Sequence, residues 1–188
     1  ELGEGWTSIA GSAFLNNSGI TSIAIPASVT SIAISAFNQA ASLATVTFAP
    51  NSTLATIGSG AFQESAITSI AIPASVTSIG VYAFYRCYSL TTVTFGTGIN
   101  LATIGAYTFY QTTALTSITI PASVTSIGDT AFVGSAIASI IIPASVTAIG
   151  DHAFNQCTSL ASVTFAAGST LATIGNNAFQ QTAIASIA

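Results

Sequence analysis

The side chains that could carry acid, base or nucleophilic chemistry are few and scattered. The chain has a single histidine, His152, and two cysteines, Cys87 and Cys157. A Ser-His-Asp triad needs three such side chains that the fold brings together, and one His among many hydroxyl residues defines no such arrangement. We therefore predict that the chain is not an enzyme and that it has neither catalytic residues nor a cofactor.

Both cysteines lie three residues after a phenylalanine, at a position where other parts of the chain carry Ser, Thr, Ala or Asn. A position that accepts small side chains favours buried free thiols over a metal or redox role. We expect no disulfide, because three repeat units separate the two cysteines, roughly 14 Å at one strand spacing per unit.

Asp129, Asp151 and His152 form the other candidate site. The two aspartates stand at the same distance before a phenylalanine, so a weak cation site with His152 nearby is one interpretation. The other is that each carboxylate accepts hydrogen bonds from backbone N–H groups of a turn, as at a helix N-cap. We favour the second interpretation and predict no metal site.

All five tyrosines and the single arginine are close together in the sequence. Tyr82 and Tyr107 share one position of the repeat, and Tyr85 and Tyr110 share another, so stacked pairs are expected. Exposed Tyr and Arg side chains are also typical of binding anchors. The group is therefore interpreted either as intramolecular stacking or as a contact for a glycan or protein. This aromatic patch consists of Tyr82, Tyr85, Arg86, Tyr88, Tyr107 and Tyr110.

An internal repeat positions all these residues. A phenylalanine preceded by a small residue recurs every 22 to 25 residues. Periods of this length are typical of solenoids, in which each unit buries its hydrophobic face against its neighbours. We predict a single solenoid of about eight coils over residues 1–188. The repeat phenylalanines are Phe14, Phe37, Phe62, Phe84, Phe109, Phe132, Phe154 and Phe179.

Each unit contains an alternation that predicts a β-strand, as in Val46 and Phe48 or Ile118 and Ile120. A proline follows four of these strands directly and ends the ladder, because it has no N–H. Units whose strand ends in Phe have two extra residues in the following turn. Later in most units an Ile precedes a Gly, which suits a positive φ or a tight corner. The four prolines are Pro26, Pro73, Pro121 and Pro143.

The run LTSITIPASVTSIGDTAF at 115–132 and the run LTTVTF at 90–95 resemble BspA-type leucine-rich repeats. Such repeats occur in surface and secreted proteins of bacteria and of some microbial eukaryotes and viruses. The resemblance covers nearly the whole chain. It implies a right-handed, mainly β leucine-rich-repeat solenoid with short helical or irregular turns, used as an adhesive or recognition scaffold. The chain departs from the family in having few Lys, Glu, Asp and Asn residues at exposed positions.

The charge content is very low. Only 3% of residues are charged, with a net charge of -4 and no lysine, against about 25% charged residues in ordinary domains. Ser or Thr interrupts every apolar run well before the roughly 20 residues of a spanning helix, so membrane insertion is not expected. Nucleic acid is not an expected partner either, because the chain has no basic groove for phosphates.

The outward positions of the predicted strands are small and regular. They carry Ser, Thr or Ala in every unit except at Ile141, and side chains that alternate with buried ones point outward. A regular face fits a regular partner, such as a second copy, a polymer or a crystal. The candidate binding residues of this sheet face are Thr45, Thr47, Thr92, Thr94, Ser117, Thr119, Ser162 and Thr164.

These patterns predict a non-enzymatic extracellular or cell-surface scaffold for adhesion or interaction. Two alternatives stay open: a self-assembling fibre or coat protein, and an ice-binding protein that uses its Ser/Thr arrays. The expected partner is another copy, end to end or face to face, or a regular extracellular surface, polymer or protein. Neither end carries a polar cap, so we expect a segment of a longer repeat array.

Overall fold

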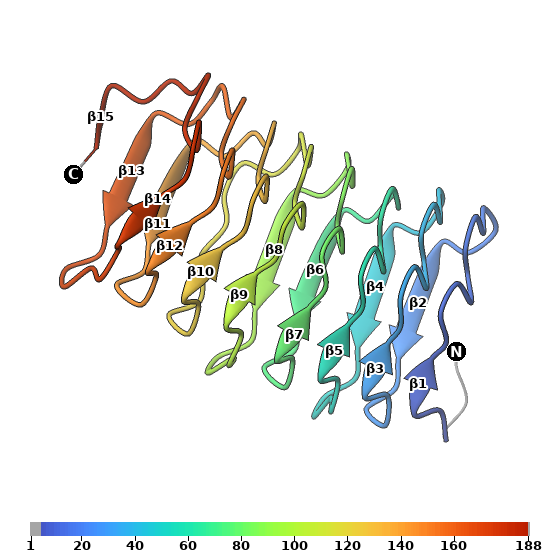
Figure 1. The fold of residues 1–188 in the computed structure, drawn as a ribbon. Coiled ribbons are helices and arrows are strands. Elements are labelled where there is room, and N and C mark those ends of the chain that lie inside the picture. Colours follow the sequence, from blue (N-terminus) through green and yellow to red (C-terminus); the bar gives the residue numbers. More distant parts are fainter. Residues whose placement is uncertain (1–4, 188) are drawn as a thin grey trace.

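The computed structural model describes residues 5–187, which form strands and turns with no helix in that range. The coils stack along one axis, with the first strands at one end and the last at the other (Figure 1). Equivalent strands of neighbouring coils pair in parallel, for example β2 (Ser22–Ile25) with β4 (Thr45–Phe48). The predicted mainly β solenoid is confirmed, its strands pair in parallel, and of the helical or irregular turns expected the described residues form irregular ones.

Two sets of strands build two faces. Eight short strands bound seven complete turns, one fewer than the predicted eight. They are β1 (Ser8–Ile9), β3 (Ser31–Ile32), β5 (Thr56–Ile57), β7 (Ser78–Ile79), β9 (Thr103–Ile104), β10 (Ser126–Ile127), β12 (Ala148–Ile149) and β14 (Thr173–Ile174). The other face carries β2, β4, β6 (Ser69–Ile72), β8 (Thr92–Phe95), β11 (Ser139–Ile142), β13 (Ser162–Phe165) and the two-residue β15 (Ser186–Ile187).

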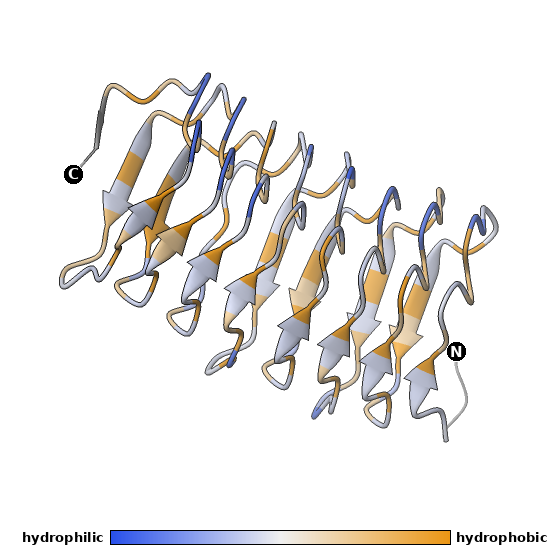
Figure 2. Cartoon of the chain, in the orientation of Figure 1, coloured by the Kyte–Doolittle hydropathy of each residue, from blue (hydrophilic) through white to orange (hydrophobic). Residues whose placement is uncertain are grey.

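The repeat phenylalanines form a continuous stack through the core. Neighbouring rings are nearly parallel, with centroid separations from 5.0 Å for Phe14 and Phe37 to 5.6 Å for Phe62 and Phe84. Inward aliphatic side chains from both strand sets pack against this stack. Figure 2 shows the resulting alternation of apolar and polar positions along the long strands. Burial of these side chains between coils holds the solenoid together, since no coil could bury its apolar face alone.

The segment around each repeat phenylalanine forms a third set of contacts between coils. The N–H of Phe37 donates to the C=O of Ala61 at 2.7 Å, and the N–H of Gln39 donates to the C=O of Gln63 at 2.7 Å. Residues two positions before and after the phenylalanine have positive φ, for example 54° at Ser35 and 56° at Gln39. This left-handed conformation costs about 1–2 kcal/mol at a residue with a Cβ. Hydrogen bonds to the next coil offset that cost.

Of the two reasons expected for the glycines after the short strands, a positive φ or a tight corner, the positive φ is wrong for Gly58 and Gly80. Gly58 and Gly80 do not have positive φ. A Cβ on Gly58 would lie 2.7 Å from the backbone of Ala33, and one on Gly80 would lie 2.4 Å from the backbone N of Ser59. These glycines are therefore required because adjacent coils approach closely, not because the chain needs a left-handed residue.

Proline interrupts the long-strand face. After β8, the N–H of Gly96 donates to the C=O of Ile72 at 2.9 Å, and Ala49 and Ala166 make equivalent bonds. Pro73 stands at the same position after β6 and has no N–H; there the pairing of β4 with β6 is reduced to Thr45 with Ser69.

The strand predicted at 117–120 is not formed. This segment precedes Pro121, and the next long strand, β11, precedes Pro143. Neither proline can donate to the coil before it, so the segment loses a ladder bond on each side. The long strands consequently divide into two sheets, β2-β4-β6-β8 and β11-β13-β15.

Candidate interaction surfaces

The predicted sheet face is solvent-exposed along the long strands. Buried residues such as Val46 and Val93 alternate with the exposed hydroxyl residues. Ser117 and Thr119 are also exposed, although their segment is not a strand. Ile141, 64% exposed, is the large apolar side chain on this face. The exposed candidates are Thr45, Thr47, Thr92, Thr94, Ser117, Thr119, Ser162 and Thr164.

Hydroxyl groups at the corners have a different role from those on the sheet face. The hydroxyl of Thr53 donates to the C=O of Ala27 at 2.6 Å, and that of Thr170 donates to the C=O of Ala144 at 2.8 Å. Such bonds link neighbouring coils. Within residues 5–187, Thr94 on the sheet face makes no side-chain hydrogen bond to the protein, and neither do Thr45, Thr47, Ser117, Thr119, Ser162 and Thr164; Thr92 only approaches the Thr91 hydroxyl. The sheet-face hydroxyls are thus available to a partner.

A groove crosses the edge of this face at the proline coil of β6. The turn after β6 has two residues fewer than the turns after β4 and β8, and residues of all three turns line the groove. The groove has a volume of about 390 Å³, with Ala71, Pro73 and Ala74 in its lining. Its walls include Phe48 and Phe95. Insertions confined to one corner therefore shape the surface without disturbing the core.

The tyrosines stack as predicted. Tyr82 and Tyr107 have ring centroids 4.7 Å apart at an interplanar angle of 13°, and Tyr85 and Tyr110 are 4.8 Å apart at 9°. Arg86 lies 5.0 Å from the centroid of Tyr85. Burial raises the pKa of the Tyr85 phenol, and the nearby Arg86 charge opposes that shift. Most of the aromatic patch is therefore engaged in contacts within the protein.

These stacked pairs span the place where both β-sheets of the solenoid are interrupted. The short-strand sheet ends at β7 and begins again at β9, and the long-strand sheet ends at β8. We call this interruption of both sheets the mid-chain junction. Hydrogen bonds of the phenylalanine segment still cross it, such as Phe84 N–H to the C=O of Thr108 at 3.0 Å. The two tyrosine pairs lie at the same place, which gives them a structural role in joining the two halves.

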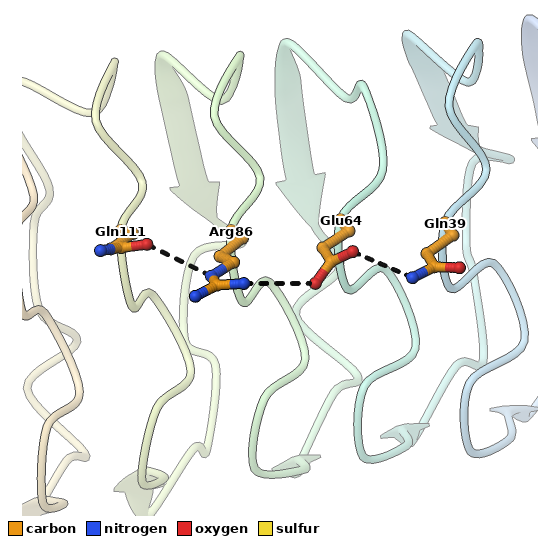
Figure 3. Close-up of polar contacts among 4 residues, drawn as sticks. All are labelled: Gln39, Glu64, Arg86 and Gln111. Atoms are coloured by element: carbon orange, nitrogen blue, oxygen red, sulfur yellow. Dashed lines mark hydrogen bonds and ion pairs between the residues drawn. The ribbon is translucent and has the colours of Figure 1, made fainter.

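A row of polar side chains, Gln39, Glu64, Arg86 and Gln111, links four successive coils (Figure 3). Gln39 donates to Glu64 at 3.0 Å, Glu64 lies 3.9 Å from Arg86, and the Nε of Arg86 donates to Gln111 at 3.2 Å. Of these residues, only Arg86 was a predicted site residue. All four lie two residues after a repeat phenylalanine, so their shared position in the repeat is the signal that could have identified the row.

The two thiols are free and buried, as predicted. The Cys87 sulfur contacts the C=O of Phe62 at 3.0 Å and the Ser65 hydroxyl at 3.7 Å. Burial raises the pKa of Cys87 to about 12, although hydrogen bonds from Ser65 oppose the shift. Burial also raises the pKa of Cys157. Neutral thiols without access to solvent are inert.

The two aspartates accept hydrogen bonds from backbone N–H groups, which agrees with the favoured interpretation. The donors belong to the following coil and not to the aspartate's own turn. Asp129 accepts from the N–H of Asp151 at 2.9 Å, and Asp151 accepts from the N–H of Asn176 at 2.6 Å. His152 is exposed. Among residues 5–187, no group of three or more His, Cys, Asp and Glu side chains is arranged to hold a metal ion. Over the same range there is no helix of the length and apolarity needed to cross a membrane.

Comparison with protein families gives a match to the BspA-type leucine-rich repeat region. The family model describes a region of six repeat copies, and it matches residues 7–135 and, overlapping them, residues 96–188. A search of curated proteins found no match.

Several solved structures share the fold. The pneumococcal vaccine antigen PcpA has a TM-score of 0.71 at 23% identity, over 97% of this chain and 56% of that protein. A leucine-rich cell surface protein of Faecalibacterium prausnitzii has a TM-score of 0.59 at 31% identity, over 85% of this chain and 42% of that protein. A leucine-rich repeat protein of T. pallidum has a TM-score of 0.57 at 24% identity, over 90% and 66%. The chain thus spans about half the length of the first two proteins.

Proposed function

The chain belongs to the BspA-type leucine-rich repeat family, and we propose that it is a non-catalytic scaffold displayed outside the cell for adhesion or interaction. The similar Faecalibacterium protein is described as a cell surface protein, which supports the location. The solenoid presents long, regular surfaces, which are used for binding in repeat proteins.

The exposed hydroxyls of the sheet face carry this proposal. The corner hydroxyls are used to link coils, whereas the hydroxyls of Thr94 and of the other sheet-face candidates except Thr92 make no hydrogen bond within the described part of the protein. The low charge of the chain leaves this face uncharged, and a flat uncharged array can approach a partner without desolvating ions.

Antibody labelling of the source cells tests the location. Antibodies against the chain should label intact cells, and mild proteolysis of intact cells should remove the signal. An antibody against a cytosolic protein serves as the control and should label only permeabilised cells. If the antibodies against the chain, like the control antibody, label only permeabilised cells, an extracellular role is contradicted.

Self-association through the same face is the second candidate function. The regular in-register pairing, for example Ser69 with Thr92 and Ala71 with Thr94, repeats one surface along the axis, and an identical surface on another copy would match it. Sedimentation velocity over a range of concentrations distinguishes this candidate, because a self-assembling chain forms larger species as concentration rises. Thermal-hysteresis measurements on the same samples test ice as an alternative ordered partner.

A further inference from the structure

Tyr88 is the one tyrosine of the aromatic patch that the stacked pairs leave free. It is 52% exposed, and within the described residues its ring stacks on no other aromatic ring. It stands four residues after Phe84, and the two preceding coils carry Ala41 and Ala66 at that position. One large ring beside two small residues produces a step in the surface.

A concave site lies at this step. Its volume is about 340 Å³, and Ala41, Ala66, Ser65 and Ser89 line it together with Tyr88. Glu64 and Arg86, whose ion pair is drawn in Figure 3, belong to the same lining. Binding sites for small molecules commonly combine apolar walls with a few convergent polar groups in this way.

The polar groups of the site indicate a neutral ligand. The side chains of Arg86 and Glu64 are 40% and 29% exposed. A guanidinium nitrogen of Arg86 lies 3.9 Å from a carboxylate oxygen of Glu64, so the two opposite charges compensate each other. Gln39 and Gln111 occupy the outer sides of the pair. The site can therefore both donate and accept hydrogen bonds but attracts neither anions nor cations strongly. Glu64 would repel an anionic ligand, and Arg86 would repel a cationic one.

We propose that this concave site binds a neutral saccharide. One face of a pyranose ring would lie against Tyr88, and its hydroxyl groups would hydrogen-bond to Glu64 and Arg86. Tyrosine suits this role because it combines an apolar ring with a polar tip. The inference rests on the proposed function as an interaction scaffold and names the ligand class of one of its surfaces.

Calorimetric titration with a panel of neutral hexasaccharides, built from glucose, mannose, galactose or N-acetylglucosamine, tests the site. At least one should bind saturably, and Tyr88→Ala should weaken that binding by about tenfold or more. Tyr88→Phe should retain most of the affinity. Ala is the residue found at positions 41 and 66, so the Tyr88→Ala variant should fold, and an unchanged circular dichroism spectrum verifies this.

Thr158→Ala is the matched control, because Thr158 occupies the same repeat position after Phe154; it should leave binding unchanged. No saturable binding to any neutral hexasaccharide would overturn the proposal. So would equal affinity of the wild-type chain and Tyr88→Ala, or a preference for sulfated heparin fragments over the neutral panel. A chain that labels on intact cells yet binds no neutral saccharide would refute this inference alone and leave the proposed function standing.

Discussion

Tyr85 stacks on Tyr110 with ring centroids 4.8 Å apart, across the junction where both β-sheets of the solenoid are interrupted. The companion pair of Tyr82 and Tyr107 lies beside it, 4.7 Å between centroids. Elsewhere in the solenoid at least one sheet continues from coil to coil. At the mid-chain junction, aromatic stacking and the hydrogen bonds of the phenylalanine segment provide the continuity that the sheets do not.

Removal of the stacking should therefore weaken the whole solenoid. We expect a double-mutant cycle of Tyr85→Ser and Tyr110→Ser to show a coupling free energy of about 0.5–1.5 kcal/mol, the range for aromatic pairs. Urea unfolding followed by circular dichroism provides the measurement. Tyr88→Ser, which removes an unstacked ring, should change the free energy of unfolding by less than about 0.5 kcal/mol. Strict additivity of the two substitutions would show that the pair has no joining role.

The proline interruptions predict locally fast amide exchange. Residues 117–120 lack the ladder bonds that protect β8 and β13, so their amides should exchange sooner with deuterium. Pro121→Ala supplies an N–H where Gly96 has one, and it should increase protection in this segment. Mass spectrometry of peptides covering 116–122 measures the change.

The net stability of the Pro121→Ala variant should differ little from that of the wild type. A new hydrogen bond contributes about 0.5–1.5 kcal/mol, and loss of the proline restriction on the unfolded chain costs about 0.4–1 kcal/mol. Pro50→Ala is the control, because Pro50 is exposed in a corner outside the strands. Unaltered exchange at 116–122 in Pro121→Ala would mean that the missing N–H does not cause the interruption.

The sequence predicts the periodic parts of this structure well and the contacts between coils poorly. The recurrence of phenylalanine and the strand alternation are sufficient to identify the solenoid, its core and its outward hydroxyls. The prediction of a strand at 117–120 was wrong because strand pairing also depends on which residue of the next coil lies beside the segment, and here that residue is Pro143. The positive φ of residues such as Gln39 and Tyr82 was not predictable, since these types rarely adopt it without tertiary support.

Ionisation of Cys87 should make stability depend on alkaline pH. The ordinary pKa of the thiol is 9.0, and burial raises it to about 12 in the folded chain. Its contribution to stability is therefore complete below pH 9 and is lost as pH rises from 9 towards 12, because the unfolded chain releases the proton first. Urea unfolding at pH 8 and pH 10.5 should show a decrease that Cys87→Ser reduces.

Serine is the matched replacement for this thiol, because Ser65 and Ser135 occupy the same position of the repeat. Burial also raises the pKa values of Tyr85 and Cys157, so these groups contribute in the alkaline range as well. The share of Cys87 is therefore the difference between the decreases in the wild type and in Cys87→Ser. An identical decrease in both chains would indicate that Cys87 does not remain neutral in the folded state.

Thr94→Lys separates the sheet face from the aromatic patch as the main contact surface. Thr94 is exposed in the middle of β8, and a long charged side chain there would hold a flat partner away from several coils. Self-association, followed by sedimentation velocity, should fall by about tenfold or more in Thr94→Lys and stay unchanged in Tyr88→Ala, while the free energy of unfolding of Thr94→Lys changes by less than about 0.5 kcal/mol. Thr103→Lys, on the short-strand face at β9, should leave association intact. If Tyr88→Ala abolishes self-association and Thr94→Lys does not alter it, the sheet face is not the contact surface, and the regularity of its hydroxyls has no role in recognition.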